Sequence, residues 1–100
     1  MSFFKRQKTK EFSCRYRIAA SRRISKVVDW NVYYRQASLS EHWSDIVRLV
    51  QESGCIILEY DFGYDDTEVN IKLRGTEINQ EKFVSEFARV SNGLYSIYRI

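Results

Sequence analysis

Residues 55–75 read CIILEYDFGYDDTEVNIKLRG, and this stretch decides the kind of fold that the chain adopts. Apolar residues alternate with polar ones on both sides of a short acidic turn, which is typical of two β-strands that each bury one face. We expect the two apolar sets to lie on the same side of the sheet, because a slip of one residue would turn the core outward. The sets are Ile56, Leu58, Tyr60 and Phe62 in the first strand, then Val69, Ile71 and Leu73 in the second.

Two loop lengths keep these apolar sets together, and they differ in the charges that they bring opposite each other. A loop of four residues places Asp61 opposite Glu68, where like charges repel unless a cation lies between them. A loop of two residues places Glu59 opposite Lys72 and Asp61 opposite Asn70, which is electrostatically better. The sequence leaves both registers open, because a glycine near the turn fits the longer loop and the charge pairing fits the shorter one.

The hairpin also holds a dense group of carboxylates, which raises the question of a metal site: Glu59, Asp61, Asp65, Asp66 and Glu68. Calcium takes about six to eight oxygen ligands in a concave loop, and the sequence lacks the glycine and closing glutamate of the EF-hand pattern. We therefore expect these carboxylates to form the solvated outer face of the hairpin. The sequence predicts neither a metal nor a cofactor.

Residues 38–54, SLSEHWSDIVRLVQESG, precede the hairpin and have the spacing of an amphipathic helix. Ser38 and Glu41 are spaced as a capping box at the helix start, and Gly54 fits the left-handed position that follows a helix end. The residues at helical spacing are Leu39, Trp43, Ile46, Val47, Leu49 and Val50. We predict that this helix packs on the sheet.

A second helix is predicted after the hairpin, over about residues 80–91. Its apolar face consists of Phe83, Phe87 and Val90. We expect Asn79 to cap the start of this helix and the Asn-Gly pair at 92–93 to end it. Residues 94–100, LYSIYRI, predict a closing strand.

Two further alternating stretches precede the first helix. Residues 12–20, FSCRYRIAA, and 27–36, VVDWNVYYRQ, each place apolar residues at every second position. The predicted order is therefore β-β-α-β-β-α-β, whose last six elements form a ferredoxin-like β-α-β-β-α-β sandwich. We predict an α+β fold in which 12–20 is an extra N-terminal strand and two helices cover one face of an antiparallel sheet.

Charge is distributed unevenly along the chain. Residues 1–26 hold nine Lys or Arg against one acid, whereas residues 27–100 hold seven against twelve. We predict a flexible basic arm over 1–11 and a single α+β domain over 12–100. Such an arm can contact nucleic acid, an anionic membrane surface or the acidic face of a partner. Phosphate contacts would come from Lys5, Arg6, Lys8, Lys10, Arg15, Arg17, Arg22 and Arg23.

The sequence does not predict catalysis. His42 is the only histidine, and Cys14 and Cys55 lie far apart without the spacing of a zinc site. No glycine-rich phosphate-binding motif occurs in the chain. The lack of a long apolar segment, a signal-peptide pattern and a glycosylation sequon favours a cytoplasmic protein with two buried, reduced thiols.

Aromatic residues make up 15% of the chain, and we expect some of them on the sheet face that the helices leave open. An apolar sheet face of this kind must be covered or used for binding. We predict that a second copy of the domain or another protein contacts Trp30, Tyr33, Tyr95 and Tyr98. Stacking of nucleic-acid bases on these rings is the alternative, although the RNP1 pattern of RNA-recognition domains has no match here.

The last half of the chain, ILEYDFGYDDTEVNIKLRGTEINQEKFVSEFARVSNGLYSIYRI, resembles the closing half of ACT-like regulatory domains. More particularly, it is similar to the soluble C-terminal domain of the MgtC/SapB family of membrane proteins. The resemblance is carried by the polar-turned hairpin, the helix EKFVSEFARV and the ending NGLYSIYRI. It implies a cytoplasmic, regulatory and self-associating domain. Amino-acid-binding ACT domains generally have a glycine-bearing loop where this chain has Gln36, Ala37 and Ser38.

We therefore expect a small, non-catalytic regulatory or interaction domain that acts by self-association, as a homodimer, or by binding another protein. The alternative is a nucleic-acid-binding protein that uses the basic arm and the sheet aromatics. A nucleic-acid binder should lose affinity steeply as salt is raised, whereas an association domain should fail when its contact aromatics are replaced.

Overall fold

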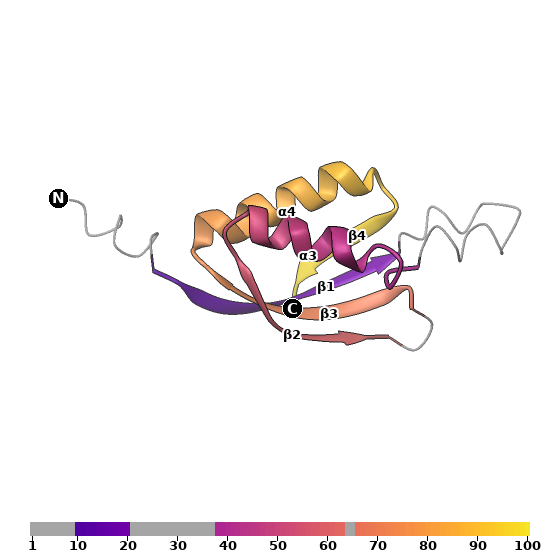
Figure 1. Cartoon of the computed structure of the whole chain (residues 1–100), viewed down its shortest axis with the longest axis horizontal. Helices are drawn as coiled ribbons and strands as arrows, with labels where there is room; N and C mark the ends of the chain where they lie inside the picture. Colours follow the sequence, from indigo (N-terminus) through magenta and orange to yellow (C-terminus); the bar gives the residue numbers. More distant parts are fainter. Residues whose placement is uncertain (1–9, 21–37, 64–65) are drawn as a thin grey trace, which may run out of the picture.

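The computed structural model describes residues 10–20, 38–63 and 66–100, and these form an α+β arrangement of two helices on a four-stranded antiparallel sheet (Figure 1). Both helices lie on the same face of the sheet. The elements in chain order are β1 Phe12–Ala20, α3 Trp43–Glu52, β2 Ile56–Phe62, β3 Glu68–Gly75, α4 Glu77–Ser91 and β4 Tyr95–Arg99.

The strands lie in the order β2-β3-β1-β4, and every neighbouring pair is antiparallel. This arrangement is compatible with the predicted ferredoxin-like fold. The position expected for residues 12–20 was wrong: β1 is not an addition to the sheet but a central strand, paired with both β3 and β4. The other predicted strand, 27–36, lies outside the described residues, so an extra strand is not confirmed.

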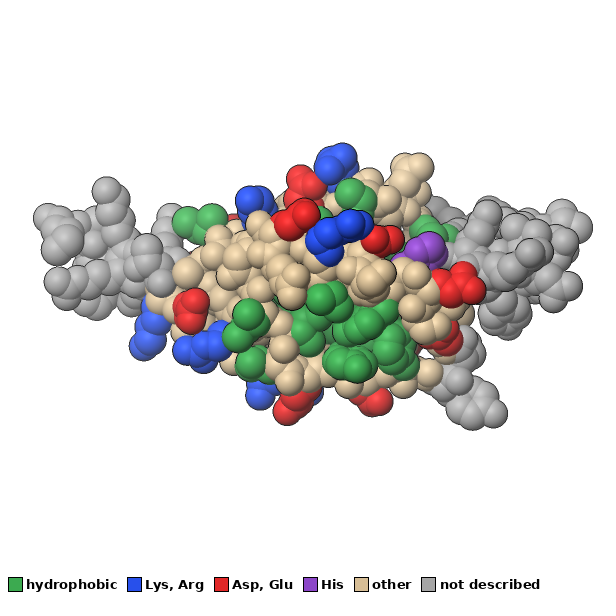
Figure 2. Space-filling view, in the orientation of Figure 1, with side chains coloured by type: hydrophobic (Ala, Val, Ile, Leu, Met, Phe, Trp, Pro, Cys, Tyr) green, Lys and Arg blue, Asp and Glu red, His purple; other side chains and the backbone are tan. Residues whose placement is uncertain are grey.

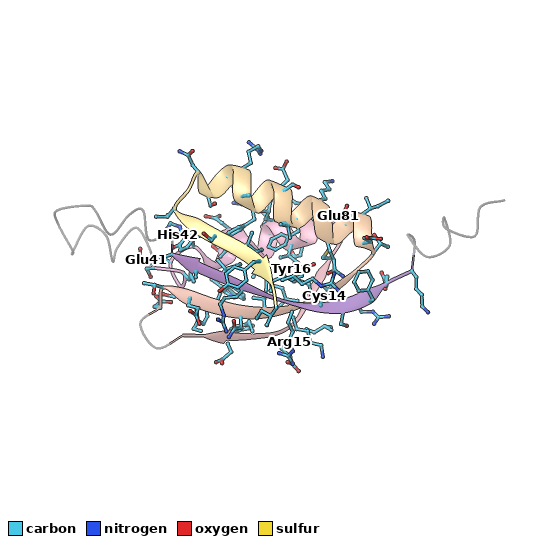
Figure 3. All side chains as sticks on the ribbon, turned by 180° about the vertical axis from the view of Figure 1, so that it is seen from behind. Cys14, Arg15, Tyr16, Glu41, His42 and Glu81 are labelled. Atoms are coloured by element: carbon cyan, nitrogen blue, oxygen red, sulfur yellow. The ribbon has the colours of Figure 1, made fainter. Side chains whose placement is uncertain are left out.

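The core lies between the sheet and the two helices, and alternation along β1 shows how the sequence builds it. Tyr16 and Ile18 are buried, whereas Arg15 is exposed and Arg17 is partly exposed on the opposite face. Figure 3 shows Tyr16 directed toward the helices and Arg15 away from them. We call the side of the sheet that carries Arg15 and Arg17 the open face. Helix residues that complete the core are Ile46, Val50, Phe83 and Phe87.

The register of the β2–β3 hairpin is the one expected for the shorter loop. Glu59 pairs with Lys72, and Asp61 pairs with Asn70. Opposite charges therefore face each other across the hairpin, and the alternative that sets Asp61 against Glu68 is wrong. Both Glu59 and Asp61 are exposed, as the solvated outer face requires.

A register shift at Leu58 divides the apolar set that we expected to share one face of β2. Ile57 pairs with the buried Leu73, so it is Ile57 that faces the core, whereas Ile56 pairs with Arg74 and is exposed. An extra residue in one strand bends it and changes which side chains point inward. The sequence does not reveal this shift, because residues 56–58 are all apolar. An apolar residue therefore faces the core whichever of the two alternations the strand follows.

The start of helix α3 also differs from the prediction. Ser38 donates its hydroxyl hydrogen to Asp66 Oδ2 at 2.7 Å, so Ser38 binds the hairpin turn and does not cap the helix. The helix begins at Trp43, and its N-cap position makes no side-chain hydrogen bond. The predicted end is confirmed: Gly54 has φ +84, and the Cys55 N–H donates to the Val50 carbonyl at 3.1 Å.

Helix α4 begins three residues earlier than about residue 80, because Thr76 and not Asn79 is its cap. The Thr76 Oγ1 accepts a hydrogen bond from the Asn79 N–H at 3.1 Å. The left-handed Asn92, φ 48, ends the helix as predicted. The closing strand β4 is also confirmed.

A buried glutamine fastens α4 to the sheet. The Gln80 Oε1 accepts a hydrogen bond from the Tyr16 hydroxyl at 2.7 Å, and its Nε2 donates to the carbonyls of Phe12 at 2.9 Å and Gly75 at 3.0 Å. Within the described residues, no buried side-chain nitrogen or oxygen lacks a hydrogen-bond partner. These hydrogen bonds hold helix α4 on strands β1 and β3.

Candidate association surface

The contact residues predicted from the sequence do not come together on the open face. Trp30 and Tyr33 lie outside the described residues. Tyr95 is 7% exposed and packs against Phe87 with ring centroids 6.2 Å apart, so it belongs to the core and not to the open face. The physical reason is the phase of β4, in which Tyr95 points toward the helices and Tyr98 toward the open face.

Tyr98 is the one predicted contact residue that the described part of the chain places on the open face. It is 49% exposed and pairs with Arg17, which in turn pairs with Asn70 on the next strand. Polar and charged side chains thus surround a single ring, and the open face is not an aromatic platform. Base stacking normally uses several rings on successive bases, so this face gives it little support.

The arginines of β1 are already paired with acidic or amide groups on the same face. Arg15 lies 3.1 Å from Glu59, and the Arg17 Nε donates to Asn70 Oδ1 at 3.0 Å. Arg17 also lies 3.7 Å from Glu68. A phosphate would have to compete with these partners. Of the remaining predicted phosphate contacts, Lys10 is exposed, and the rest lie outside the described residues: Lys5, Arg6, Lys8, Arg22 and Arg23.

A different surface gathers the exposed apolar side chains. Three residues of β2 are exposed although they are large and apolar: Ile56 at 54%, Leu58 at 45% and Tyr60 at 56%. Helix α3 lies beside them and adds the partly exposed Trp43 and Val47. Figure 2 shows hydrophobic side chains gathered over α3 and β2. We call these five residues, with Phe62, the α3–β2 surface.

Aromatic rings form the centre of this surface. The Trp43 ring lies 4.7 Å from that of Tyr60 and 5.3 Å from that of Phe62, measured between centroids. The Tyr60 and Phe62 rings are 5.8 Å apart and nearly perpendicular, at 78°. These are ordinary distances for stabilising aromatic pairs. The rings therefore hold one another in place while Tyr60 keeps more than half of its surface in solvent.

The α3–β2 surface is hollowed where the helix meets the strand. This hollow has a volume of about 330 Å³. Its walls are mainly apolar and come from both elements: Trp43, Val47, Val50, Gln51, Ile56, Ile57, Leu58 and Tyr60. A side chain from a binding partner could enter such a hollow and bury the surrounding apolar surface.

Strand β2 is also an unpaired edge among the strands that the structure describes. The Gly63 N–H donates to the Glu68 carbonyl at 2.6 Å, which makes these two residues a hydrogen-bonded pair. Backbone groups in an antiparallel pair alternate between facing the partner and facing away from it. Tyr60 and Phe62 therefore direct their backbone N–H and C=O groups to the free side of β2.

A second hollow of about 390 Å³ lies between α3 and α4. Phe87 and Leu49 contribute to its apolar lining, and Val90, expected in the core, is instead 55% exposed at its side. His42 also lines it, with its ring centroid 6.3 Å from that of Tyr95 and the two rings inclined at 72°. Its charged lining includes an ion pair of 2.6 Å between Asp45 and Arg48. Tyr95, at the start of the edge strand β4, also lines this hollow.

Two buried side chains, Tyr16 and Cys55, have shifted pKa values. Burial raises the pKa of the Tyr16 phenol, and burial also raises the pKa of the Cys55 thiol. A raised thiol pKa reduces the thiolate that a nucleophile needs. Both Cys14 and Cys55 are buried free thiols, as predicted. Within residues 10–20, 38–63 and 66–100, no three His, Cys, Asp or Glu side chains are grouped to hold a metal.

Sequence reasoning missed most of the α3–β2 surface. Trp43 was assigned to the buried face of its helix, and Leu58 and Tyr60 to the buried face of β2. One signal was present, because residues 56–58 are all apolar and an alternating strand cannot bury all three.

No helix in the described part of the chain is long and apolar enough to cross a membrane.

Comparison of the sequence with models of known protein families finds no match, and comparison with curated proteins finds none either. The resemblance of the C-terminal half to ACT-like domains therefore stays a prediction.

Proposed function

We propose that this chain is a non-catalytic interaction domain of ferredoxin-like topology that binds polypeptides through its α3–β2 surface. The observation that carries this proposal is the exposure of Ile56, Leu58 and Tyr60 on an edge strand that no described strand covers. Natural proteins usually protect such edges, because unpaired backbone groups beside apolar side chains recruit other chains. Here the exposed apolar residues continue onto a neighbouring helix.

The energetics of the surface suit protein association. Complete burial of a large apolar side chain contributes roughly 1.5–3 kcal/mol. Leu58 and Tyr60 each still expose about half of their surface, so a partner could gain a substantial part of this from each. Trp and Tyr are also the residues that most often dominate binding at interfaces. Trp43 and Tyr60 lie at the centre of the α3–β2 surface, which is the usual place for such residues.

We further propose a regulatory role in a reducing compartment such as the cytoplasm. The two buried free thiols, Cys14 and Cys55, suit a compartment in which disulfides are not maintained. The regulatory role rests on the resemblance to ACT-like domains and has no support from the geometry of the surface itself.

The test is the selection of binders from an unbiased library of displayed peptides, with two exposed-site variants as probes. We expect Leu58→Lys, on the α3–β2 surface, to weaken the selected peptides at least tenfold, because it places a charge where apolar side chains should meet. Val90→Lys is the matched control, because Val90 is as exposed but lies in the groove between α3 and α4. It should leave binding unchanged.

Light scattering across a concentration series completes this test, since a second copy would also count as a polypeptide partner. Self-association that Leu58→Lys abolishes supports the proposal. The proposal is wrong if the chain stays monomeric and selects no peptide, or if Val90→Lys is the variant that disrupts binding. Binding of the chain to an oligonucleotide at low salt would favour the nucleic-acid alternative, if the Leu58→Lys variant binds equally well.

A further inference from the structure

We infer that the partner of the α3–β2 surface is an extended peptide segment with alternating basic and apolar residues, which joins the sheet as a strand beside β2. This inference rests on the proposed function and names the chemistry of the partner. Peptides that add a strand to a sheet edge obtain affinity from backbone hydrogen bonds and specificity from alternate side chains. The two sides of the β2 edge specify what those side chains must be.

The backbone of β2 offers a short, defined docking site. Tyr60 and Phe62 direct their N–H and C=O groups outward, which follows from the hydrogen bond of Gly63 to Glu68. The register shift at Leu58 interrupts the regular spacing of the strand. An added strand can therefore pair with the end of β2 that contains residues 59–62, and it extends past the shift only through side-chain contacts.

The helix side of this edge selects apolar side chains. Tyr60 and Phe62 point to that side, where Trp43 packs against both rings. The partner's residues that point to the same side would lie against these rings and against the hollow beside Val47. A charged side chain there would lose its solvation without finding an opposite charge.

The open-face side of the edge selects basic side chains. Glu59 and Asp61 are the two open-face residues at this end of β2. Glu59 already has Arg15 at 3.1 Å and Lys72 as its cross-strand neighbour, whereas Asp61 lies opposite the neutral Asn70. Among the residues that the structure describes, no cation forms an ion pair with Asp61. A Lys or Arg opposite Asp61 on an added strand would supply that charge.

A second copy of β2 fits this edge poorly. Two-fold antiparallel pairing that joins Tyr60 to Phe62 of the second copy sets Asp61 against Asp61 of that copy. The register that joins Tyr60 to Tyr60 sets Asp61 against Glu59 of the second copy. Like charges directly opposite each other destabilise a strand pair, so these two registers are disfavoured. The register that joins Phe62 to Phe62 sets Asp61 against Gly63 of the second copy, and light scattering tests for such a dimer.

The fold already contains one strand of the inferred chemistry. Strand β1 alternates Arg15 and Arg17 on the open face with Cys14, Tyr16 and Ile18 on the helix side. Its arginines meet Glu59 and Glu68, and its apolar side chains enter the core. A strand added beside β2 would meet a similar environment. It would face acids on the open face and aromatic rings on the helix side.

The experiment measures binding of three labelled octapeptides by fluorescence anisotropy. The first alternates Arg with Val and Tyr, the second replaces each Arg with Glu, and the third carries a central proline that prevents strand pairing. We expect only the first to bind, with affinity that falls as salt is raised from about 0.05 M to about 0.5 M. Asp61→Lys should weaken it roughly five- to tenfold, because it replaces an attraction by a repulsion.

Glu81→Lys is the matched control, because Glu81 is an equally acidic, exposed residue on α4 and should leave peptide binding unchanged. Binding of the Glu peptide in place of the Arg peptide, lost in Leu58→Lys, overturns the inferred charge but retains the proposed function. Self-association abolished by Leu58→Lys, with no peptide bound, shows that the occupant is a second copy and also overturns it. If none of the three octapeptides binds, the inference is wrong, and the proposed function is wrong as well only if the chain also stays monomeric and selects no peptide from the unbiased library.

Discussion

At the scale of single residues, Gln80 shows best how the sequence holds this fold together. A glutamine in a helix is usually a surface residue, but Gln80 is 2% exposed and has three hydrogen bonds to β1 and β3. Its amide accepts a hydrogen bond from one hydroxyl and donates to two backbone carbonyls. A buried polar group without a partner costs about 1–3 kcal/mol. Replacing Gln80 should therefore lower the free energy of unfolding.

We predict that Gln80→Leu lowers the free energy of unfolding by roughly 1–3 kcal/mol, because it leaves the buried Tyr16 hydroxyl without its partner and removes the amide's hydrogen bonds to two carbonyls. Tyr16→Phe should cost about 1 kcal/mol. Denaturant unfolding measures both, and the double variant should cost less than the two single costs added together. Glu81→Leu, one residue along the same helix and exposed, is the control and should change stability little. Additive costs would show that the two side chains are not coupled.

The two buried groups with raised pKa values predict how stability responds to alkaline pH. Burial raises the pKa of Cys55 and that of Tyr16 above their ordinary values of about 8.5 and about 10. In the unfolded chain each group therefore loses its proton at lower pH than in the folded chain. The stabilisation is complete below the unfolded pKa values and is lost as pH rises through the folded ones.

The free energy of unfolding should thus begin to fall above about pH 8.5, and more steeply above about pH 10. Denaturant titrations at a series of pH values measure this decline. Cys55→Ala should remove the first part of the decline and Tyr16→Phe the second, whatever each substitution does to stability at neutral pH. If both variants retain the wild-type pH dependence, these groups are not its source.

At the scale of secondary-structure elements, the sequence predicted what depends on local pattern and failed where distant contacts decide. Alternation and charge pairing reduced the hairpin register to two alternatives, of which the structure has the one with the shorter loop, and the ends of both helices followed from Gly54 and Asn92. The start of α3 was wrong because Ser38 binds Asp66, which is distant in sequence. No local pattern carries that information.

The strand order and the candidate site could not be predicted from local sequence patterns either. Alternation identifies 12–20 as a strand but does not state that it lies between β3 and β4. The shift at Leu58 moves one apolar residue out of phase, and the sequence of residues 56–58 reads as apolar in either phase. Tyr60 keeps the expected phase, opposite the buried Ile71, but lies on an edge strand and stays 56% exposed, which alternation alone does not reveal.

At the scale of the whole molecule, the two faces and two edges of the sheet are used differently. The helices cover one face, and the open face is polar, with its β1 arginines paired to Glu59, Glu68 and Asn70. Among the described residues, the β2 edge combines unpaired backbone, aromatic rings and an acid, Asp61, that forms no ion pair. This concentration of binding features at one edge is why we propose the α3–β2 surface, and not the sheet aromatics, as the binding site.

Hydrogen exchange of the backbone amides, followed by NMR with and without the Arg-containing octapeptide, tests this central claim most directly. An added strand would hydrogen-bond the outward N–H groups of Tyr60 and Phe62, so we predict that exchange of these two amides slows when the peptide binds. Amides around Tyr98 on the open face should not change. Slowed exchange around Tyr98 or in the groove between α3 and α4, with Tyr60 and Phe62 unchanged, would contradict the account.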